Sequence, residues 1–356
     1  MHLLDYKLIS LIISGSFLSL FICYFLTIIS AKINLIGLDK FDGIQKIHTK
    51  MASRLGGLSI LLSMTFLIIF YKIIDETLLN ILISSIPLII VGLVEDLTQK
   101  VRVRTRILAF IFSSLTLVFL DRSFFTGLDL DIIDINLFKS YQFQLLFGVI
   151  GVTAATNAFN FIDGVNGISS GIGIYSLCMF VFLVGINPNY TLIIFMIAFV
   201  SCIFGFFVIN IFSGKIFLGD LGAYLIGFFI STIGVAIVKE NSTISPWIIF
   251  LIILYPATEL IFSTFRRLFN GVPPFKADDK HLHSIIYKLI LKKISLRSKH
   301  FCNSLTGIII VLFGSLPGII YINYNNNSII FKIIFTYISL YCLVYFILHR
   351  IEVFEE

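Results

Sequence analysis

Charged residues are scarce in this chain. Only 13% of its 356 residues are Asp, Glu, Lys or Arg, and 58% are hydrophobic, whereas about a quarter of a typical soluble domain is charged. This composition excludes an ordinary soluble globular enzyme. The net charge of +6 would suggest nucleic acid in a soluble protein. Here the placement of Lys and Arg in membrane loops explains the charge, so we expect no nucleic-acid partner.

Cysteine pairs with metal or redox spacing are also missing. The five cysteines show no CxxC spacing, and four lie inside apolar runs, which is typical of small buried hydrophobic residues. We also expect no cleavable signal peptide. The first apolar stretch, 8–31, is too long for a signal h-region and has only a weakly basic start.

Long apolar runs are what the chain has in abundance. A bilayer core of about 30 Å needs about 20 apolar residues in a helix, and the runs predict eleven transmembrane helices. The fold class is therefore an all-α polytopic integral membrane protein, with one transmembrane catalytic domain over 1–356. The predicted spans are 8–31, 55–74, 78–94, 107–120, 143–160, 168–186, 191–213, 222–238, 246–264, 303–322 and 329–348.

The distribution of Lys and Arg predicts the orientation. Cytoplasmic loops carry an excess of both residues, and 20 of the 26 lie on one side if the N-terminus is outside and the C-terminus is cytoplasmic. The predicted cytoplasmic loops are about 32–54, 95–106, 157–168, 214–222 and 265–302. The longest contains SIIYKLILKKI, whose apolar residues at helical spacing alternate with lysines, which suits the membrane surface.

The polar residues of the third loop form a regular series. Asn157, Asn160 and Asp163 are spaced by three, so on a helix end they share one face. Gly164 and Gly167 then allow a tight turn where the backbone can approach a phosphate. Helix capping is the alternative. Three such groups on a membrane helix are costly without partners, which favours a functional site.

A carboxylate stands in a glycine-rich turn in the fourth loop. Asp220, between Gly219 and Gly222, can ligate Mg²⁺ while substrate phosphates supply other ligands. An N-cap for the next helix is the alternative. Phe217 is a candidate for stacking on a base, or an interfacial aromatic residue.

Acids and imidazoles meet in the fifth loop. Its ADDKHLH segment contains Asp278, His281 and His283. The spacing of the two histidines favours a loop over one helical face, and no cysteine is near enough to complete a zinc site. Imidazoles beside a phosphate fit this segment better.

Cations precede a glycine pair in the first loop. Lys46, His48 and Arg54 come just before Gly56 and Gly57. This arrangement suits a diphosphate, although anchoring by the positive-inside rule explains Lys and Arg equally well.

An acid pair, Glu95 and Asp96, ends the third span and precedes a run of cations. Together the five loops offer carboxylates for a divalent cation, glycine turns, cations and imidazoles. Phosphoryl transfer needs this set because its catalysis consists mainly of positioning and charge neutralisation. The sequence thus indicates a membrane enzyme that joins a soluble phosphate donor to a lipid acceptor.

These motifs resemble the polyprenyl-phosphate N-acetylhexosamine-1-phosphate transferase family. The resemblance covers about residues 39–290, with QKIHTKMASRLGG, the acid pair, NAFNFIDGVNG, FLGDLG and ADDKHLHS in family order. It implies transfer of a sugar phosphate from a UDP-amino-sugar to undecaprenyl phosphate with Mg²⁺, or Mn²⁺ as an alternative. The products are an undecaprenyl-diphosphate-sugar and UMP.

The resemblance also implies roles for residues of this chain. The expected catalytic residues are Glu95, Asp96, Asp163, His281 and His283. Asp220 is the expected metal ligand. The expected substrate-binding residues are Lys46, His48, Arg54, Asn157, Asn160, Phe217 and Asp278.

The chain departs from the family pattern at four positions. Glu95 replaces the first Asp of the family's acid pair, and Gln99 stands where a third Asp often follows that pair. Ser284 replaces the third His of a His-Leu-His-His motif, and Ser53 replaces a Pro. The missing histidine argues against the phospho-MurNAc-pentapeptide transferase of peptidoglycan synthesis. Glu259, in the ninth span, is the main feature that would favour a transporter or flippase instead.

The expected location is the bacterial inner membrane, with the active site facing the cytoplasm. GlcNAc is the default sugar, with FucNAc or QuiNAc as alternatives, and the polymer would be an O-antigen, a capsule or a similar polysaccharide. The oligomeric state is left open between a monomer and a homodimer.

Overall fold

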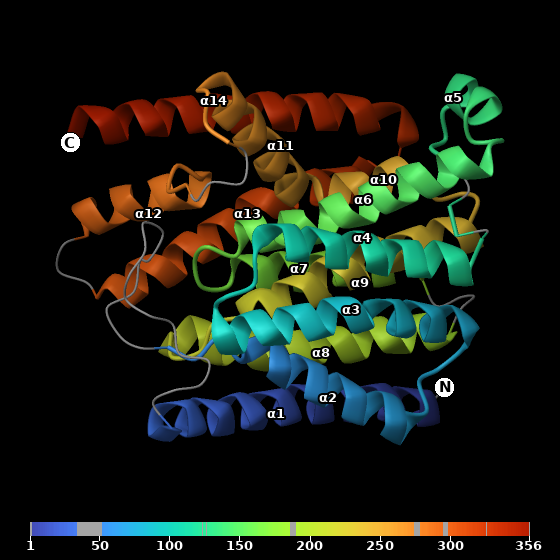
Figure 1. Ribbon diagram of the computed structural model, residues 1–356, viewed down its shortest axis with the longest axis horizontal. Helices are drawn as coiled ribbons and strands as arrows, with labels where there is room; N and C mark the ends of the chain where they lie inside the picture. The colour runs from blue at the N-terminus through green and yellow to red at the C-terminus, as the bar shows by residue number, and fades with distance from the viewer. Residues whose placement is uncertain are drawn as a thin grey trace.

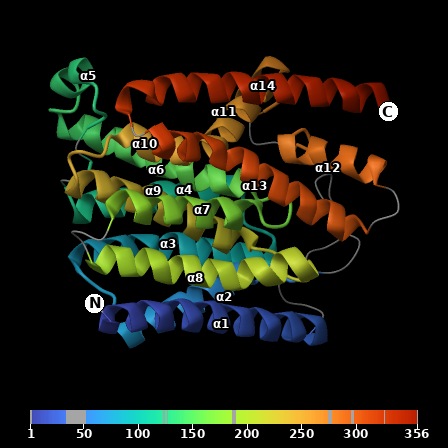
Figure 2. The same cartoon turned by 180° about the vertical axis from the view of Figure 1, so that it is seen from behind.

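The chain folds as a bundle of long helices whose axes run mostly side by side (Figures 1 and 2). This arrangement is seen in a computed structural model. The residues that it describes are 2–33, 52–122, 124–125, 127–185, 190–273, 278–294, 298–324 and 326–355. Apart from one isolated bridge between Ser53 and Ile216, these segments contain no β-structure. The all-α prediction is confirmed.

The helices have the following bounds. In chain order they are α1 (His2–Ile33), α2 (Gly56–Tyr71), α3 (Glu76–Thr98), α4 (Val103–Leu120), α5 (Asp131–Asn136), α6 (Tyr141–Ile162), α7 (Ile168–Val184), α8 (Tyr190–Ser213), α9 (Gly219–Glu240), α10 (Pro246–Ile252), α11 (Leu254–Phe269), α12 (Leu282–Lys293), α13 (Lys299–Tyr324) and α14 (Ile330–Glu355). A short 3₁₀ helix, Asn327–Ile329, precedes α14.

Most of these helices suit a bilayer. Within the described segments, eight are long and apolar enough to cross it, and the bent pair α10 and α11 makes a ninth candidate. The shorter apolar helices α2 and α7 lie where two further spans are predicted. A multi-pass membrane protein is therefore established, while the number eleven stays a prediction.

The two ends of the chain lie at opposite ends of the bundle (Figure 1). An odd number of spans requires this arrangement. The turn between α3 and α4 and helix α12 lie at the same end as the C-terminus. Which of these ends faces the cytoplasm rests on the Lys and Arg distribution and stays a prediction.

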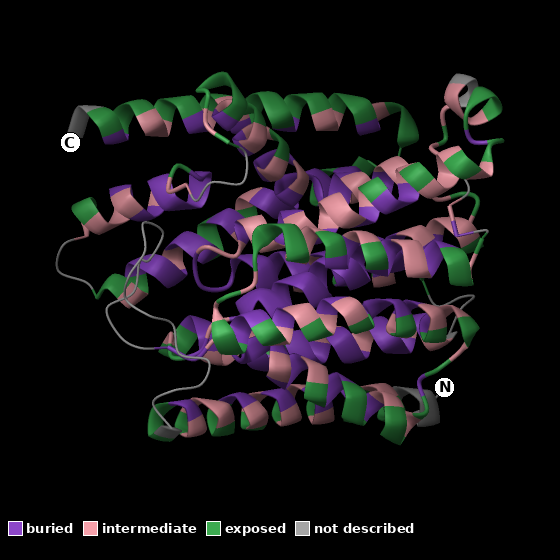
Figure 3. Cartoon of the chain, in the orientation of Figure 1, coloured by how far each residue is buried: buried purple, intermediate pink, exposed green. Residues whose placement is uncertain are grey.

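Helix α9 forms the centre of the bundle and is buried along almost its whole length (Figure 3). Helices α2, α3, α6 and α7 pack around it. Glycines permit the closest approaches: a Cβ on Gly57 would lie 2.2 Å from the backbone nitrogen of Gly222, and one on Gly92 would lie 2.6 Å from Cα of Leu221. The beginning of α9 is thereby clamped between α2 and α3.

The predicted ninth span, 246–264, is not one straight helix. It breaks at Ile253, and α10 and α11 meet at an angle of 75°. Pro256 explains the break because it has no N–H for the carbonyl of Ile252, and its ring crowds that carbonyl. The bend directs α11 across the bundle (Figure 1).

The glycine clamp on α9 gives the first prediction. Replacing Gly57 by Ala should lower the free energy of unfolding by about 2 kcal/mol or more, because the new methyl group would overlap backbone that has no room to move. Thermal unfolding of the purified protein in detergent measures this change. The matched control is Gly151→Ala on α6, where a Cβ meets nothing within 4 Å. Equal stability of the two variants would contradict the clamp.

Candidate active site

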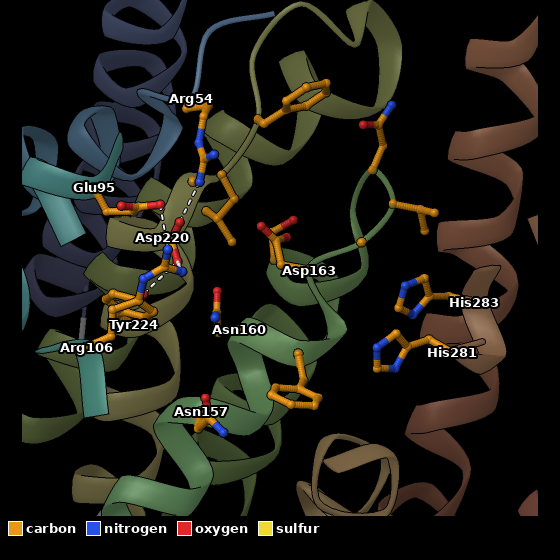
Figure 4. A pocket seen from close by; sticks show the side chains of 18 of the residues that line it. Arg54, Glu95, Arg106, Asn157, Asn160, Asp163, Asp220, Tyr224, His281 and His283 are labelled. Atoms are coloured by element: carbon orange, nitrogen blue, oxygen red, sulfur yellow. Dashed lines mark hydrogen bonds and ion pairs between the residues drawn. The ribbon is translucent and has the colours of Figure 1, made fainter. Parts of the chain in front are cut away.

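One cavity of about 490 Å³ opens at the end of the bundle where the C-terminus lies. Its wall includes residues from α3, α4, α6, α9, α11 and α12, and from the turns that join them. Figure 4 shows an acid–arginine cluster on one side, Asp163 in the middle and two histidines on the other side. The site thus joins segments that are far apart in the sequence.

The segment before α2 is paired with the segment before α9. Ser53 N donates to the carbonyl of Lys215 at 3.0 Å, and Phe217 N donates to the carbonyl of Ser53 at 2.7 Å. The turn into α9 then needs Gly219, whose φ is +75° and where a Cβ would lie 2.2 Å from the carbonyl oxygen of Arg54. This pairing brings Arg54 beside Asp220.

Asp96 binds the N-terminus of α9 from the neighbouring helix α3. Its two carboxylate oxygens accept hydrogen bonds from the backbone nitrogens of Asp220 and Leu221, at 2.8 and 2.9 Å. A carboxylate satisfies the free N–H groups of a helix start and suits its positive dipole end. Asp96 is buried and does not line the cavity. Its contacts therefore hold Asp220 in place.

Asp220 is surrounded by donors. Arg54 Nη2 lies 2.5 Å from one carboxylate oxygen. Arg106 Nη1 and the hydroxyl of Tyr224 lie 3.2 and 2.6 Å from the other. Figure 4 shows both guanidinium groups directed at this carboxylate. The cluster thus presents one acid and two arginines to the cavity.

Glu95 links the turn after α3 to Arg106. One oxygen accepts from the backbone nitrogen of Val101 at 2.8 Å, and the other lies 2.6 Å from Arg106 Nη2. The longer side chain of Glu, compared with the Asp found in the resembled family, serves both partners at once. Glu95 is thus part of the network that orients Arg106 toward Asp220.

The end of α6 forms the middle of the cavity. Asn157, Asn160 and Asp163 all line it, as their spacing by three predicts (Figure 4). Burial and the nearby carboxylate of Asp220 raise the pKa of Asp163 to about 7, although Arg54 opposes them. An arriving cation would favour the ionised form of this group.

Helix α13 holds the turn that follows Asp163. Asn166 N donates to Oδ1 of Asn303 at 2.7 Å. A Cβ on Gly307 would lie 1.9 Å from the carbonyl oxygen of Asn166, so α13 packs directly on this turn. Asn303 thereby fixes the turn beside the cavity.

The two histidines form the opposite wall. Their rings are parallel, with centroids 5.3 Å apart. His283 reaches so close to the turn after α6 that a Cβ on Gly164 would lie 2.0 Å from its Nε2. Burial, and next the neighbouring His281, lower the pKa of His283 to about 3. His283 is therefore a neutral imidazole near pH 7.

Asp278 joins the loop before α12 to the end of α11. Its carboxylate accepts from Arg266 Nη2 at 2.6 Å and from Arg267 Nε at 3.2 Å. Burial acts against ionisation, but hydrogen bonds from Arg266 and from the backbone N–H of Lys280 lower the pKa of Asp278 to about 2. Asp278 is thus a fixed anion that anchors two arginines.

The structure brings most of the predicted site residues to this one cavity. Those that line it are Arg54, Glu95, Asn157, Asn160, Asp163, Phe217, Asp220, Asp278, His281 and His283. Asp96 lies just beneath it, and Lys46 and His48 fall outside the described residues. The chemical roles assigned to all of these residues remain predictions.

Sequence reasoning missed several polar residues of the site. Arg106, Tyr224 and Arg267 line the cavity, although none of the three is among the site residues predicted from the sequence. Helical spacing gave no signal for Arg106, because α3 ends between it and Glu95. Asn303 lies beyond all five loops and offered no signal.

The site fits a metal ion that is held mainly by its substrate. Among the residues that the structure describes, no group of three or more His, Cys, Asp or Glu side chains is placed to hold a metal. Mg²⁺ commonly takes only one or two carboxylates from a protein and completes its shell with phosphates and water. Asp220 and Asp163 can supply that share.

Comparison with known proteins shows the family of this chain. Residues 78–238 match the model of glycosyl transferase family 4. A Sulfolobus acidocaldarius protein with the assigned name UDP-N-acetylglucosamine–dolichyl-phosphate N-acetylglucosaminephosphotransferase is 30% identical over 290 residues, which cover 76% of this chain and 84% of the relative. The chain belongs to glycosyl transferase family 4.

Two bacterial relatives carry undecaprenyl-phosphate N-acetylglucosaminyl 1-phosphate transferase names. The Thermotoga maritima protein is 29% identical over 72% of this chain and 74% of its own length. The Bacillus subtilis protein is 25% identical over 67% of this chain and 66% of its own length. The matched region of the family 4 model contains Glu95 through Asp220, whereas the histidine wall lies beyond it.

The reach of Glu95 can be tested on this family 4 protein. Glu95→Asp should destabilise the fold by about 1 kcal/mol, because the shorter acid loses either the Val101 N–H or Arg106. Thermal unfolding in detergent gives the change. Glu76→Asp, at the exposed first turn of the same helix, is the control. An unchanged melting temperature for Glu95→Asp would mean that the shorter acid satisfies both partners.

The neutral state of His283 predicts a pH effect on stability. The unfolded chain binds a proton at His283 below about pH 6.5, while the folded chain does not until about pH 3. Folding stability from this residue is therefore lost as pH falls, by about 2 kcal/mol between pH 6.5 and 5. Asp163 acts in the opposite direction, since its folded-state pKa is raised.

His283→Gln isolates the histidine contribution. We expect the wild-type protein to lose stability relative to this variant as the pH is lowered from 7 to 5, measured by thermal unfolding at each pH. If the difference between the two proteins is independent of pH, His283 is protonated in the folded state at a normal pKa.

Proposed function

We propose that this chain transfers an N-acetylhexosamine-1-phosphate from a UDP-sugar to undecaprenyl phosphate, and so starts a cell-surface polysaccharide. One observation carries the proposal: a single cavity at the end of a membrane bundle combines carboxylates, arginines, amides and imidazoles. The names of the T. maritima and B. subtilis relatives support undecaprenyl phosphate as the acceptor and GlcNAc as the default sugar.

The reaction is a displacement at phosphorus. An oxygen of the lipid phosphate attacks the β-phosphorus of the UDP-sugar, and the bond from that phosphorus to the oxygen bridging to the α-phosphorus breaks. UMP leaves with the bridging oxygen, and the new diphosphate joins lipid and sugar. The second pKa of a phosphate monoester is near 6, so the acceptor needs little help from a general base at pH 7.

Residues of the chain supply charge and orientation for this step. Arg54 and Arg106 point into the cavity and can neutralise phosphate oxygens, while Asn157 and Asn160 offer amide donors from α6. Asp220, with Asp163, would hold Mg²⁺. When bound, the ion neutralises the diphosphate and stabilises the charge that develops on UMP. Asp96 maintains this arrangement by holding the start of α9.

Two alternatives are less well supported. Ser284 lines the cavity at the position of the third His of the resembled motif, which disfavours a phospho-MurNAc-pentapeptide transferase. Glu259 would be the centre of a transport path, but its carboxylate is hydrogen-bonded to His281 and Tyr341 beside the cavity.

We further propose that the protein lies in the inner membrane with this cavity facing the cytoplasm.

The role of Asp220 gives a direct test. Membranes containing the protein should convert radiolabelled UDP-GlcNAc and undecaprenyl phosphate into labelled lipid and UMP in the presence of Mg²⁺. Asp220→Asn should reduce this transfer at least about 100-fold, because the variant loses the charge that faces the arginines and the metal.

Asp75→Asn is the matched control for this test. Asp75 caps the start of α3, at the end of the bundle far from the cavity, by accepting a hydrogen bond from Leu78 N. Because Asn caps a helix equally well, transfer should be unchanged. Full activity of Asp220→Asn with intact Mg²⁺ dependence would refute the metal assignment. Labelled sugar that crosses vesicles without forming lipid-linked product would instead show a transporter.

A further inference from the structure

Glu259 is an acid buried inside the bundle, on α11, and it does not line the cavity. It also lies outside residues 78–238, which match the family. A buried carboxylate is costly unless hydrogen bonds satisfy it. Its partners should therefore show what it contributes.

Both oxygens of Glu259 are occupied. Oε1 lies 2.9 Å from Nδ1 of His281 and accepts from the hydroxyl of Ser263 at 3.1 Å. Oε2 accepts from the hydroxyl of Tyr341 at 2.7 Å. Tyr341 belongs to α14, so the last helix of the chain binds the carboxylate oxygen that does not contact His281.

The other ring nitrogen of His281 decides the tautomer. Nε2 lies 3.2 Å from Nη2 of Arg267. A guanidinium group only donates hydrogen bonds, so Nε2 must be the unprotonated nitrogen of the ring. The proton is then on Nδ1 and is donated to Glu259.

Arg267 is the residue that this chain of bonds orients. Its Nε is held by Asp278 at 3.2 Å, and its guanidinium carbon lies 5.3 Å from the ring centroid of Phe161. With Nη2 bonded to His281, three sides of the group are fixed and the cation borders the cavity. An anionic group of a bound substrate would therefore find the guanidinium of Arg267 already oriented.

We propose that Glu259 is a positioning residue that fixes His281 as the neutral Nδ1–H tautomer and, through it, the guanidinium of Arg267 at the cavity wall. Tyr341 keeps Glu259 in this geometry, which makes α14 part of the site. The inference about the tautomer stands on the contacts alone. Its kinetic consequence rests on the proposed transferase function.

The tautomer can be read without any substrate. The full-length protein labelled with ¹⁵N-histidine should show, near pH 7.5, one residue with a protonated Nδ1 and an unprotonated Nε2 that disappears in His281→Ala. In Glu259→Gln the population of this tautomer should fall. A wild-type His281 that is protonated on Nε2, alone or with Nδ1, would overturn the proposal.

The kinetic arm uses a double-mutant cycle in the transfer assay. Glu259→Gln should lower kcat/KM for the UDP-sugar about 10- to 100-fold, by analogy with the loss of carboxylates that orient metal-bound histidines. In a His281→Ala background the same change should have less than a twofold effect. Equal losses in both backgrounds would show that Glu259 acts on the fold rather than through His281.

Thr258→Val is the matched control for this cycle. Thr258 neighbours Glu259 on α11, is also buried, and its hydroxyl has no hydrogen-bond partner within the described part of the chain. This variant should retain wild-type transfer. If no preparation transfers sugar phosphate but the Nδ1–H signal is present, the proposed function fails and the positioning role stands.

Discussion

The contact between Asp96 and the first N–H groups of α9 is the interaction on which the site depends. It joins the end of α3 to the start of the most buried helix, at a point where glycines bring α2 and α3 against α9. Asp220 is the second residue of α9 and one of the two residues whose N–H groups Asp96 binds. Its carboxylate is therefore positioned by a helix rather than by a flexible loop. Arg54 and Arg106 then converge on that carboxylate from two further segments.

The cavity has two walls with different chemistry. One wall consists of two arginines, Arg54 and Arg106, that form ion pairs with two carboxylates, Glu95 and Asp220. An anionic substrate or a cation would therefore compete with these ion pairs. The other wall consists of two histidines. Burial keeps His283 neutral, and Glu259 orients His281. Asp163 stands between the walls, and burial raises its pKa to about 7. A diphosphate bound between them would meet fixed donors on both sides.

Much of this site was predictable because its residues come in short clusters at helix ends. Asn157, Asn160 and Asp163 repeat at helical spacing, and Asp220 stands between glycines, so each cluster carries a local signal. Arg267 and Glu259 were not predictable as partners, because a cation near a membrane end and an acid in a span each have several common explanations. Their link through His281 exists only where α11, α12 and α14 meet.

The sequence by itself determined the class of protein, its long apolar helices and the polar clusters at helix ends, since apolar length and residue spacing are local properties of the chain. Tertiary structure alone decided that Asp96 supports the site while Glu95 lines it, although the two are adjacent in sequence. It also decided that the ninth span bends at Ile253 and that α13 and α14 bond to residues next to the cavity, through Asn303 and Tyr341. These facts depend on packing between distant helices, which local spacing does not encode.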